Sequence, residues 1–288
     1  ERDAFQRLDD RARKQRDRGG RALGDEHLQS LLAHPSFRSP LVPLIGLCDE
    51  ALRGRFSARP RPLLPRAAQV TGRRHPFSLE VRTLQTVLGY RGFDLYFLPE
   101  HPELVSVWPG PRPVIVLGRD ALLDTATTAE RRFLAGRAAF FCRAGLARVH
   151  DLGAERTLDM LQQLEALFVP RPDDESPPTL VEALPERVAE ALAAAVDAVP
   201  TGTLPVLHTG EAVIEGIART ADRAGLLTSG RLRAAATCLA RDRGVGSAMP
   251  AARDLTWAVR SGSRLRDLVK YALSEQYHQL RHAAGLAL

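Results

Sequence analysis

The alternation of apolar and polar positions predicts a short run of strands followed by a series of helices. FDLYFL at 93–98, LVSVW at 104–108 and PVIVLG at 113–118 are short segments rich in β-branched or aromatic residues, as is typical of strands. Before them, apolar residues recur at helical spacing over 78–90. After them, the same spacing predicts helices at 128–149, 156–168, 179–198, 210–227, 231–241, near 250–260, and at 262–284. We therefore expect an α+β fold that is mostly helical, with a small β-sheet.

The region before the strands is less regular. Residues 25–58 carry apolar pairs at helical spacing but are interrupted by three prolines, so we expect several short helices. Residues 1–24 are polar and arginine-dense, with acids and bases interleaved, which favours an exposed helix over a nucleic-acid-binding arm. The segment RPRPLLPR at 59–66 is too rich in proline for a long helix and is interpreted as a linker.

These patterns divide the chain of 288 residues into three expected parts. Residues 1–70 form an arginine-rich helical segment with a proline-rich linker, 71–245 form the main domain, and 246–288 form C-terminal helices packed on the core. Because the chain begins with Glu1 and not with Met, we expect it to be a fragment of a longer protein.

Composition and charge narrow the range of partners. The chain is 44% hydrophobic and 26% charged, as is ordinary for a soluble globular protein, and it has no run of 18 apolar residues that would suggest a membrane span. Of the 40 basic residues, all but Lys14 and Lys270 are arginines, and the net charge is +6. These arginines are spread along the chain, so a GC-rich genome explains them more simply than a nucleic-acid surface does. Nucleic acid nevertheless stays open as a second class of partner.

The cysteines favour a cytoplasmic protein with reduced thiols. Cys48, Cys142 and Cys238 lie far apart, and no two of them form a CxxC pair. A thiolate zinc site or a redox motif is therefore not predicted. Reduced, buried thiols are the simplest interpretation.

Two segments of the chain resemble parts of a known enzyme family. They are PVIVLGRDALLDTATTAERRFLAGRAAFFCRAG at 113–145 and IARTADRAGLLTSGRLRAAATCL at 217–239. Over roughly 77–240 the chain resembles the soluble core of the CAAX-prenyl-endopeptidase and heat-shock-protease type of zinc metallopeptidase. In that family a strand and turn lead into a helix bearing HExxH, and a later helix carries a third zinc ligand in an ExxxD pattern. The resemblance implies that helix 128–149 packs against helix 210–227.

The zinc motif of the family is missing at the matching positions. GRAAFF puts Arg137 and Phe141 in place of the two His, and Ala138 in place of the catalytic Glu. In the later helix Asp222 matches the Asp of ExxxD, whereas Ala218 stands at the ligand Glu. HExxH works because its two His point at one metal while its Glu acts as base. An arginine is a fixed cation and a phenylalanine offers only apolar surface, so neither can hold zinc. The chain is similar to degenerate copies of this domain in large repeat-containing bacterial proteins.

The resemblance implies a pseudoenzyme with no catalytic residue, no metal and no cofactor. We expect a non-catalytic scaffold or regulatory interaction module that binds another protein, or a neighbouring domain of the same polypeptide. No GxSxG elbow, GxxxxGK[ST] phosphate loop or strand-linked GxGxxG motif suggests a different chemistry. One alternative is a nucleic-acid-binding module that uses the arginines.

A second alternative is a hydrolase with a displaced metal site. His208, Glu211 and Glu215 lie around the start of a predicted helix and could supply three ligands. Acidic residues in a first helical turn are, however, favoured by the helix dipole alone. Glu215 lies one turn before Ala218 and is the residue placed to replace the lost ligand.

Something must fill the space that the zinc would occupy, because protein interiors leave few voids. The resemblance places Arg137 and Asp222 on facing helices, close to the vacated position. We predict an ion pair between them, with the guanidinium contacting the carboxylate bidentately and Phe141 filling the remaining space.

Overall fold

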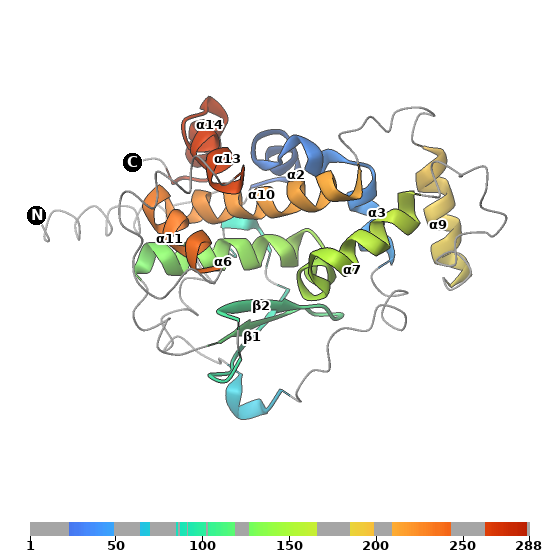
Figure 1. The fold of residues 1–288 in the computed structure, drawn as a ribbon, viewed down its shortest axis with the longest axis horizontal. Coiled ribbons are helices and arrows are strands. Elements are labelled where there is room, and N and C mark those ends of the chain that lie inside the picture. Colours follow the sequence, from blue (N-terminus) through green and yellow to red (C-terminus); the bar gives the residue numbers. More distant parts are fainter. Residues whose placement is uncertain are drawn as a thin grey trace, which may run out of the picture.

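The computed structural model consists of a layer of helices above a small sheet (Figure 1). The expectation of a mostly helical α+β fold is therefore confirmed. None of the helices it describes is long and apolar enough to cross a membrane. The description covers residues 23–48, 64–69, 85, 87–90, 92–101, 103–118, 127–165, 185–198, 209–242 and 263–286. The helix predicted at 250–260, the one predicted at 1–24 except for its last two residues, and most of the helix predicted at 78–90 and of the linker at 59–66 lie outside these ranges.

The sheet forms where the sequence predicts strands. Its strands are β1 (Asp94–Phe97), β2 (Val105–Trp108) and β3 (Val114–Leu117), in the spatial order β1-β3-β2. The central strand β3 pairs with β1 in parallel and with β2 in antiparallel orientation. Its last three residues are completely buried, so both faces of β3 are covered.

Two long helices form the centre of the molecule. α6 (Thr128–Arg143) lies over the sheet. α10 (Gly210–Ser229) packs on the side of α6 that faces away from the sheet (Figure 1). Thr127 and Glu130 make a capping box at the start of α6, since each side chain accepts the other's backbone N–H. α10 ends at Gly230, whose φ of 64° suits a glycine in the left-handed region.

Short helices before the sheet pack directly on α10 and its neighbours. They are α2 (Asp25–His27), η1 (Leu28–Leu32), η2 (Pro35–Arg38) and α3 (Leu41–Cys48). The turn η4 (Arg66–Ala68) lies instead beside the sheet, where the adjacent Gln69 forms a bridge to Tyr96 of β1. η2 contacts α10, whereas α3 contacts α7 and α9. The prolines divide this region into short pieces as expected, although Pro43 is tolerated in the first turn of α3, where its missing N–H has no helical partner.

The predicted helix 128–149 is wrong at its C-terminal end. α6 ends at Arg143, because Gly145 takes a left-handed turn with φ of 69° and the N–H of Leu146 bonds back to the carbonyl of Phe141 at 2.9 Å. The following helix, α7 (Ala147–Glu165), therefore begins well before the predicted residue 156, and Gly153 kinks it.

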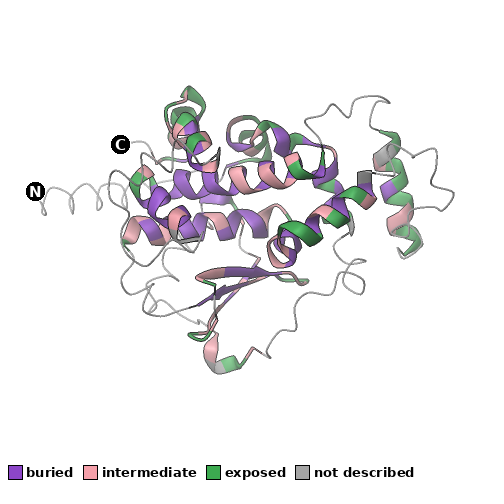
Figure 2. Cartoon of the chain, in the orientation of Figure 1, coloured by how far each residue is buried: buried purple, intermediate pink, exposed green. Residues whose placement is uncertain are grey.

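The predicted helix 262–284 is two helices. α13 (Ser263–Ala272) and α14 (Glu275–Ala283) meet at Ser274, whose hydroxyl accepts the N–H of Tyr277 and caps α14. Both contact α10 (Figure 1). The remaining helices are α9 (Glu186–Asp197), which is shorter than predicted, and α11 (Leu232–Asp242), which packs on α6. Buried residues concentrate where α6 and α10 face one another (Figure 2).

Candidate functional site

α6 and α10 pack so closely that only glycine fits at two positions, Gly136 and Gly225. A Cβ added at Gly136 would overlap Thr228 Oγ1, and one added at Gly225 would lie 2.7 Å from the carbonyl oxygen of Phe133. The Thr228 hydroxyl also donates to the carbonyl oxygen of Arg132 across this contact, at 2.9 Å. The pairing of these two helices is the one that the resemblance implies, and the helices touch backbone to backbone at this point.

Arg137 and Asp222 lie side by side, one turn further along the same contact. Arg137 Nε is 3.1 Å from Asp222 Oδ1. The Asp222 side chain is only 1% exposed and that of Arg137 is 17% exposed, so the charges are largely removed from water. The two residues expected to pair do so, across the interface that joins α6 to α10.

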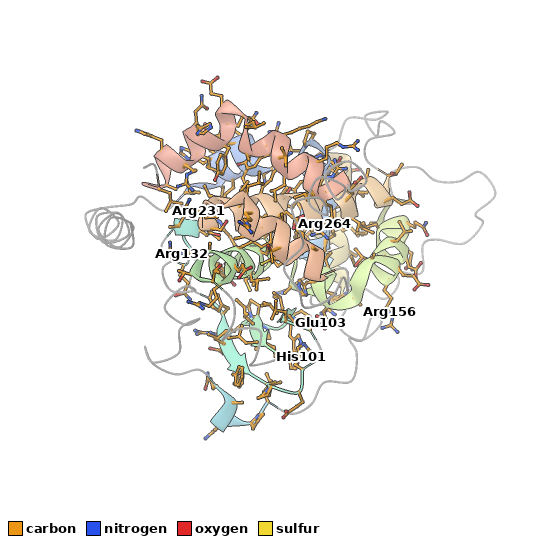
Figure 3. All side chains as sticks on the ribbon, turned by 60° about the vertical axis from the view of Figure 1, so that its left-hand side comes forward. His101, Glu103, Arg132, Arg156, Arg231 and Arg264 are labelled. Atoms are coloured by element: carbon orange, nitrogen blue, oxygen red, sulfur yellow. The ribbon has the colours of Figure 1, made fainter. Side chains whose placement is uncertain are left out.

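The bidentate partner of Asp222 is Arg264 of α13, and not Arg137 as predicted. Arg264 Nε donates to Asp222 Oδ2 at 2.8 Å, and Arg264 Nη2 donates to Oδ1 at 2.7 Å. This bidentate contact, or fork, uses both carboxylate oxygens, and Arg137 Nε makes its ion pair with Oδ1 beside it. Figure 3 labels Arg264 among the side chains of the helical layer. The sequence carries no local signal for this contact, because Arg264 is 42 residues away from Asp222.

A second bidentate arginine–carboxylate contact lies beside the first, and here α10 supplies the arginine and α13 the carboxylate. Arg223, the next residue of α10, donates from Nε to Asp267 Oδ2 at 3.1 Å and from Nη2 to Oδ1 at 2.9 Å. Arg264 and Asp267 lie one turn apart on α13, so both can face adjacent residues of α10. The Arg223 guanidinium also lies 4.6 Å from the ring centroid of Tyr271. Two reciprocal forks therefore fix α13 to α10.

His34 borders this network. Its Nδ1 accepts the backbone N–H of Ser36 at 3.2 Å and caps η2. Its Nε2 lies 3.0 Å from Arg219 Nη1 and 3.8 Å from Asp267 Oδ1. Burial lowers the pKa of His34, and the nearby arginines act in the same direction, whereas Asp267 opposes the shift. The imidazole is thus held in its neutral form.

The other positions that the resemblance matches to the zinc motif carry apolar side chains. Ala138 and Phe141 are buried, and Ala218 is partly buried. The Phe141 ring packs edge-on against His150 of α7, with a centroid distance of 4.9 Å. The space-filling role predicted for the Phe141 ring beside Arg137 and Asp222 stays a prediction.

The displaced metal site gains no support from the described residues. They contain no group of three or more His, Cys, Asp or Glu side chains that could hold a metal ion. Glu215 instead pairs with Arg219 one turn along α10, and Glu211 is exposed. His208 lies outside the described residues.

A polar cluster that the sequence did not suggest lies at the end of the sheet (Figure 3). Ser106 Oγ donates to Glu103 Oε2 at 2.5 Å and lies 2.6 Å from His101 Nε2. The serine hydroxyl thus lies between the imidazole and the carboxylate, and Ser106 is 2% exposed. This order differs from a Ser–His–acid triad, in which the acid orients the imidazole. The cluster ties the β1–β2 connection to β2.

The two described cysteine side chains are free, buried thiols. Cys142 and Cys238 are 3% and 2% exposed. Burial raises the pKa of Cys142 to about 12, so its thiol stays protonated and unreactive.

Comparisons with protein-family models, with curated proteins and with solved structures found no match for this chain. The relation to zinc metallopeptidases therefore rests on the residues quoted above and stays a proposal.

Proposed function

We propose that this chain is a non-catalytic scaffold or regulatory module that binds another protein, or a neighbouring domain of its own polypeptide. It would be built on a metallopeptidase-like pair of helices that has lost its metal. The observation that carries this proposal is the arginine–aspartate–arginine cluster of Arg137, Asp222 and Arg264 at the α6–α10 contact.

The cluster supports the proposal through its charge. The resemblance puts Arg137 at a zinc-ligand position, where its fixed positive charge would repel a divalent cation. Asp222 is engaged by two guanidinium groups, so its carboxylate is not available to orient a ligand or a water molecule. The same contacts hold α6, α10 and α13 in one arrangement, as a scaffold requires.

Restoring the lost motif tests the relation on which the proposal depends. The quadruple variant Arg137→His, Ala138→Glu, Phe141→His and Ala218→Glu rebuilds HExxH and the third ligand. We expect it to hold about one zinc per chain by elemental analysis, and the wild-type chain to hold none. The single variant Arg137→His is the matched control and should stay free of zinc. A folded quadruple variant without zinc would contradict the metallopeptidase relation.

Binding measurements distinguish the proposed protein-interaction module from a displaced metal site and from a nucleic-acid-binding module. Calorimetric titration of the chain with the neighbouring domain of its own polypeptide should give a saturable complex. A wild-type chain that carried one zinc, lost on Glu215→Ala, would instead favour the displaced metal site. Nucleic-acid binding that weakened steeply with rising salt would favour the arginine-dependent alternative.

A further inference from the structure

A cavity of about 470 Å³ lies where the C-terminal turn of α6 meets α2, η1, η2 and α3. Much of its wall is apolar, with Leu28, Phe37, Val42 and Phe140 contributing the larger side chains. Small-molecule sites in proteins are typically clefts of roughly 300–1,000 Å³ with an apolar wall and a few polar groups. This cavity has that size and composition, and the residues of the α10–α13 forks are not among its described lining.

Most of the charge on the wall is already paired. Arg143 contacts Asp25 with Nη2 to Oδ1 at 2.7 Å, and its Nη1 donates to the carbonyl oxygens of Leu23 and Leu88. Arg38 differs, because it is exposed and, among the described residues, donates one hydrogen bond, from Nη2 to the carbonyl oxygen of Ser30 at 3.0 Å. A guanidinium has five N–H donors in a planar fork, so Arg38 keeps donors for an anion.

Ser39 adds a buried donor next to Arg38. Its side chain lines the cavity and the residue is only 1% exposed. Its Oγ accepts the N–H of Leu41 at 3.3 Å. A hydroxyl donates one hydrogen bond as well as accepting, and the described residues provide no acceptor for this proton. A buried donor without an acceptor is costly unless a ligand satisfies it.

We propose that this cavity binds a small amphipathic carboxylate. The apolar body of the ligand would lie against Phe37, Val42 and Phe140, and its carboxylate would accept hydrogen bonds from Arg38 and from the Ser39 hydroxyl. Among the described residues of the wall, Arg38 is the cation without an ion pair, so it matches one negative charge. The apolar wall matches a compact hydrocarbon or aromatic group. This site is separate from the scaffold function proposed above, and either could hold without the other.

Gly46 offers a way to close the cavity without disturbing the fold. It lines the cavity in α3, and a Cβ added there would meet nothing within 4 Å. Gly46→Leu should therefore fill the cavity while improving the local helix propensity. Gly46→Ala is the matched control, because it makes the same helical improvement but adds only one methyl group.

The test uses the purified whole chain and two probes, octanoate and its uncharged analogue octanol, by calorimetry and thermal shift. We expect octanoate to bind at one site per chain and at least about tenfold more tightly than octanol, as a charge-assisted hydrogen bond implies. Gly46→Leu should abolish binding of both probes, whereas Gly46→Ala should retain it. Arg38→Gln should remove the preference for octanoate, and Arg66→Gln, which changes an exposed arginine of η4, should not.

Three outcomes would overturn the proposal. The first is the absence of saturable octanoate binding to the folded wild-type chain at millimolar concentration. The second is binding that persists in a folded Gly46→Leu variant, which would place the probe elsewhere on the surface. The third is equal affinity for octanoate and octanol, or an unchanged preference in Arg38→Gln, which would exclude carboxylate recognition by Arg38.

Discussion

At the scale of single residues, Asp222 holds an unusual position, because one carboxylate in the core faces two guanidinium groups from different helices. Arg264 takes both of its oxygens and Arg137 approaches one of them. Such an arrangement is stable only while the carboxylate is present, since its loss leaves two partly buried cations facing one another.

Replacing Asp222 with Ala should therefore lower the free energy of unfolding by roughly 3–5 kcal/mol. Replacing all three members with apolar residues of similar volume, as in Asp222→Leu with Arg137→Met and Arg264→Met, should cost much less, because no uncompensated charge remains. Urea denaturation measures both. Glu215→Ala is the control, because its pair with Arg219 is more exposed and should contribute at most about 1 kcal/mol. A loss at Asp222 no larger than at Glu215 would refute the role of the cluster.

His34 gives a prediction about pH. Burial lowers its pKa below the usual value of 6.5, so the folded state favours the neutral imidazole. The unfolded chain then binds a proton more readily than the folded chain, and stability is full above pH 6.5 and decreases as pH falls from there through the folded pKa. His34→Asn removes the titration but keeps an acceptor for the N–H of Ser36. Its stability should therefore vary less between about pH 5 and 7 in urea titrations; an unchanged slope would contradict this explanation.

At the scale of elements, the interface of α6 and α10 depends on glycine. A methyl group in an ordinary helical glycine position stabilises a protein by about 0.5–1 kcal/mol. At Gly225 the same methyl group would meet the backbone and ring of Phe133 at 2.7 Å. The helices would have to separate, which would weaken the contacts around Asp222 as well.

Gly225→Ala should therefore destabilise the protein by about 1–3 kcal/mol, as overpacking does in a dense core. Gly46→Ala, in the open environment of α3, should stabilise it by about 0.5–1 kcal/mol. Thermal unfolding of the two variants side by side gives the comparison. A stabilising Gly225→Ala would show that α6 and α10 can move apart without cost.

The elements that the sequence predicts correctly are those with strong local signals. The three strands follow from runs of β-branched and aromatic residues. α10 begins at the predicted residue 210 and ends two residues beyond the predicted 227. The break after Arg143 was missed because apolar residues continue at helical spacing across Gly145, although this glycine turns left-handed. Arg264 was missed for a different reason. Its partner lies on another helix, and only the folded arrangement of α10 and α13 brings them together.

At the scale of the whole molecule, the segment before the sheet is part of the core. Phe37, Leu41 and Ile45 are buried, and a Cβ at Gly216 of α10 would lie 2.7 Å from the backbone nitrogen of Phe37. The carbonyl oxygens of Leu31 and Leu32 also accept hydrogen bonds from α13 and α10. The described residues of this region therefore wrap onto the main helices.

Deleting residues 1–48 should prevent cooperative folding. Each large apolar side chain that it removes from the core contributes about 1.5–3 kcal/mol, and the total approaches the roughly 5–15 kcal/mol that stabilises a typical domain. Deleting only 1–22 should leave a cooperative thermal transition, because the described core begins at Leu23. Calorimetry of the two truncated chains tests both expectations. A cooperative transition in the chain without 1–48 would contradict the first, and the loss of that transition in the chain without 1–22 would contradict the second.

The second half of α10 has one more property, which concerns the exchange of its backbone hydrogens. Every residue from Thr220 to Ser229 is buried, so this stretch has no water-facing side from which amides could exchange by small local openings. Deuterium can then enter only when α6, α11 and α13 all come away from it. These ten amides should exchange together, at the rate set by complete unfolding of the chain, while the exposed helix α9 exchanges first.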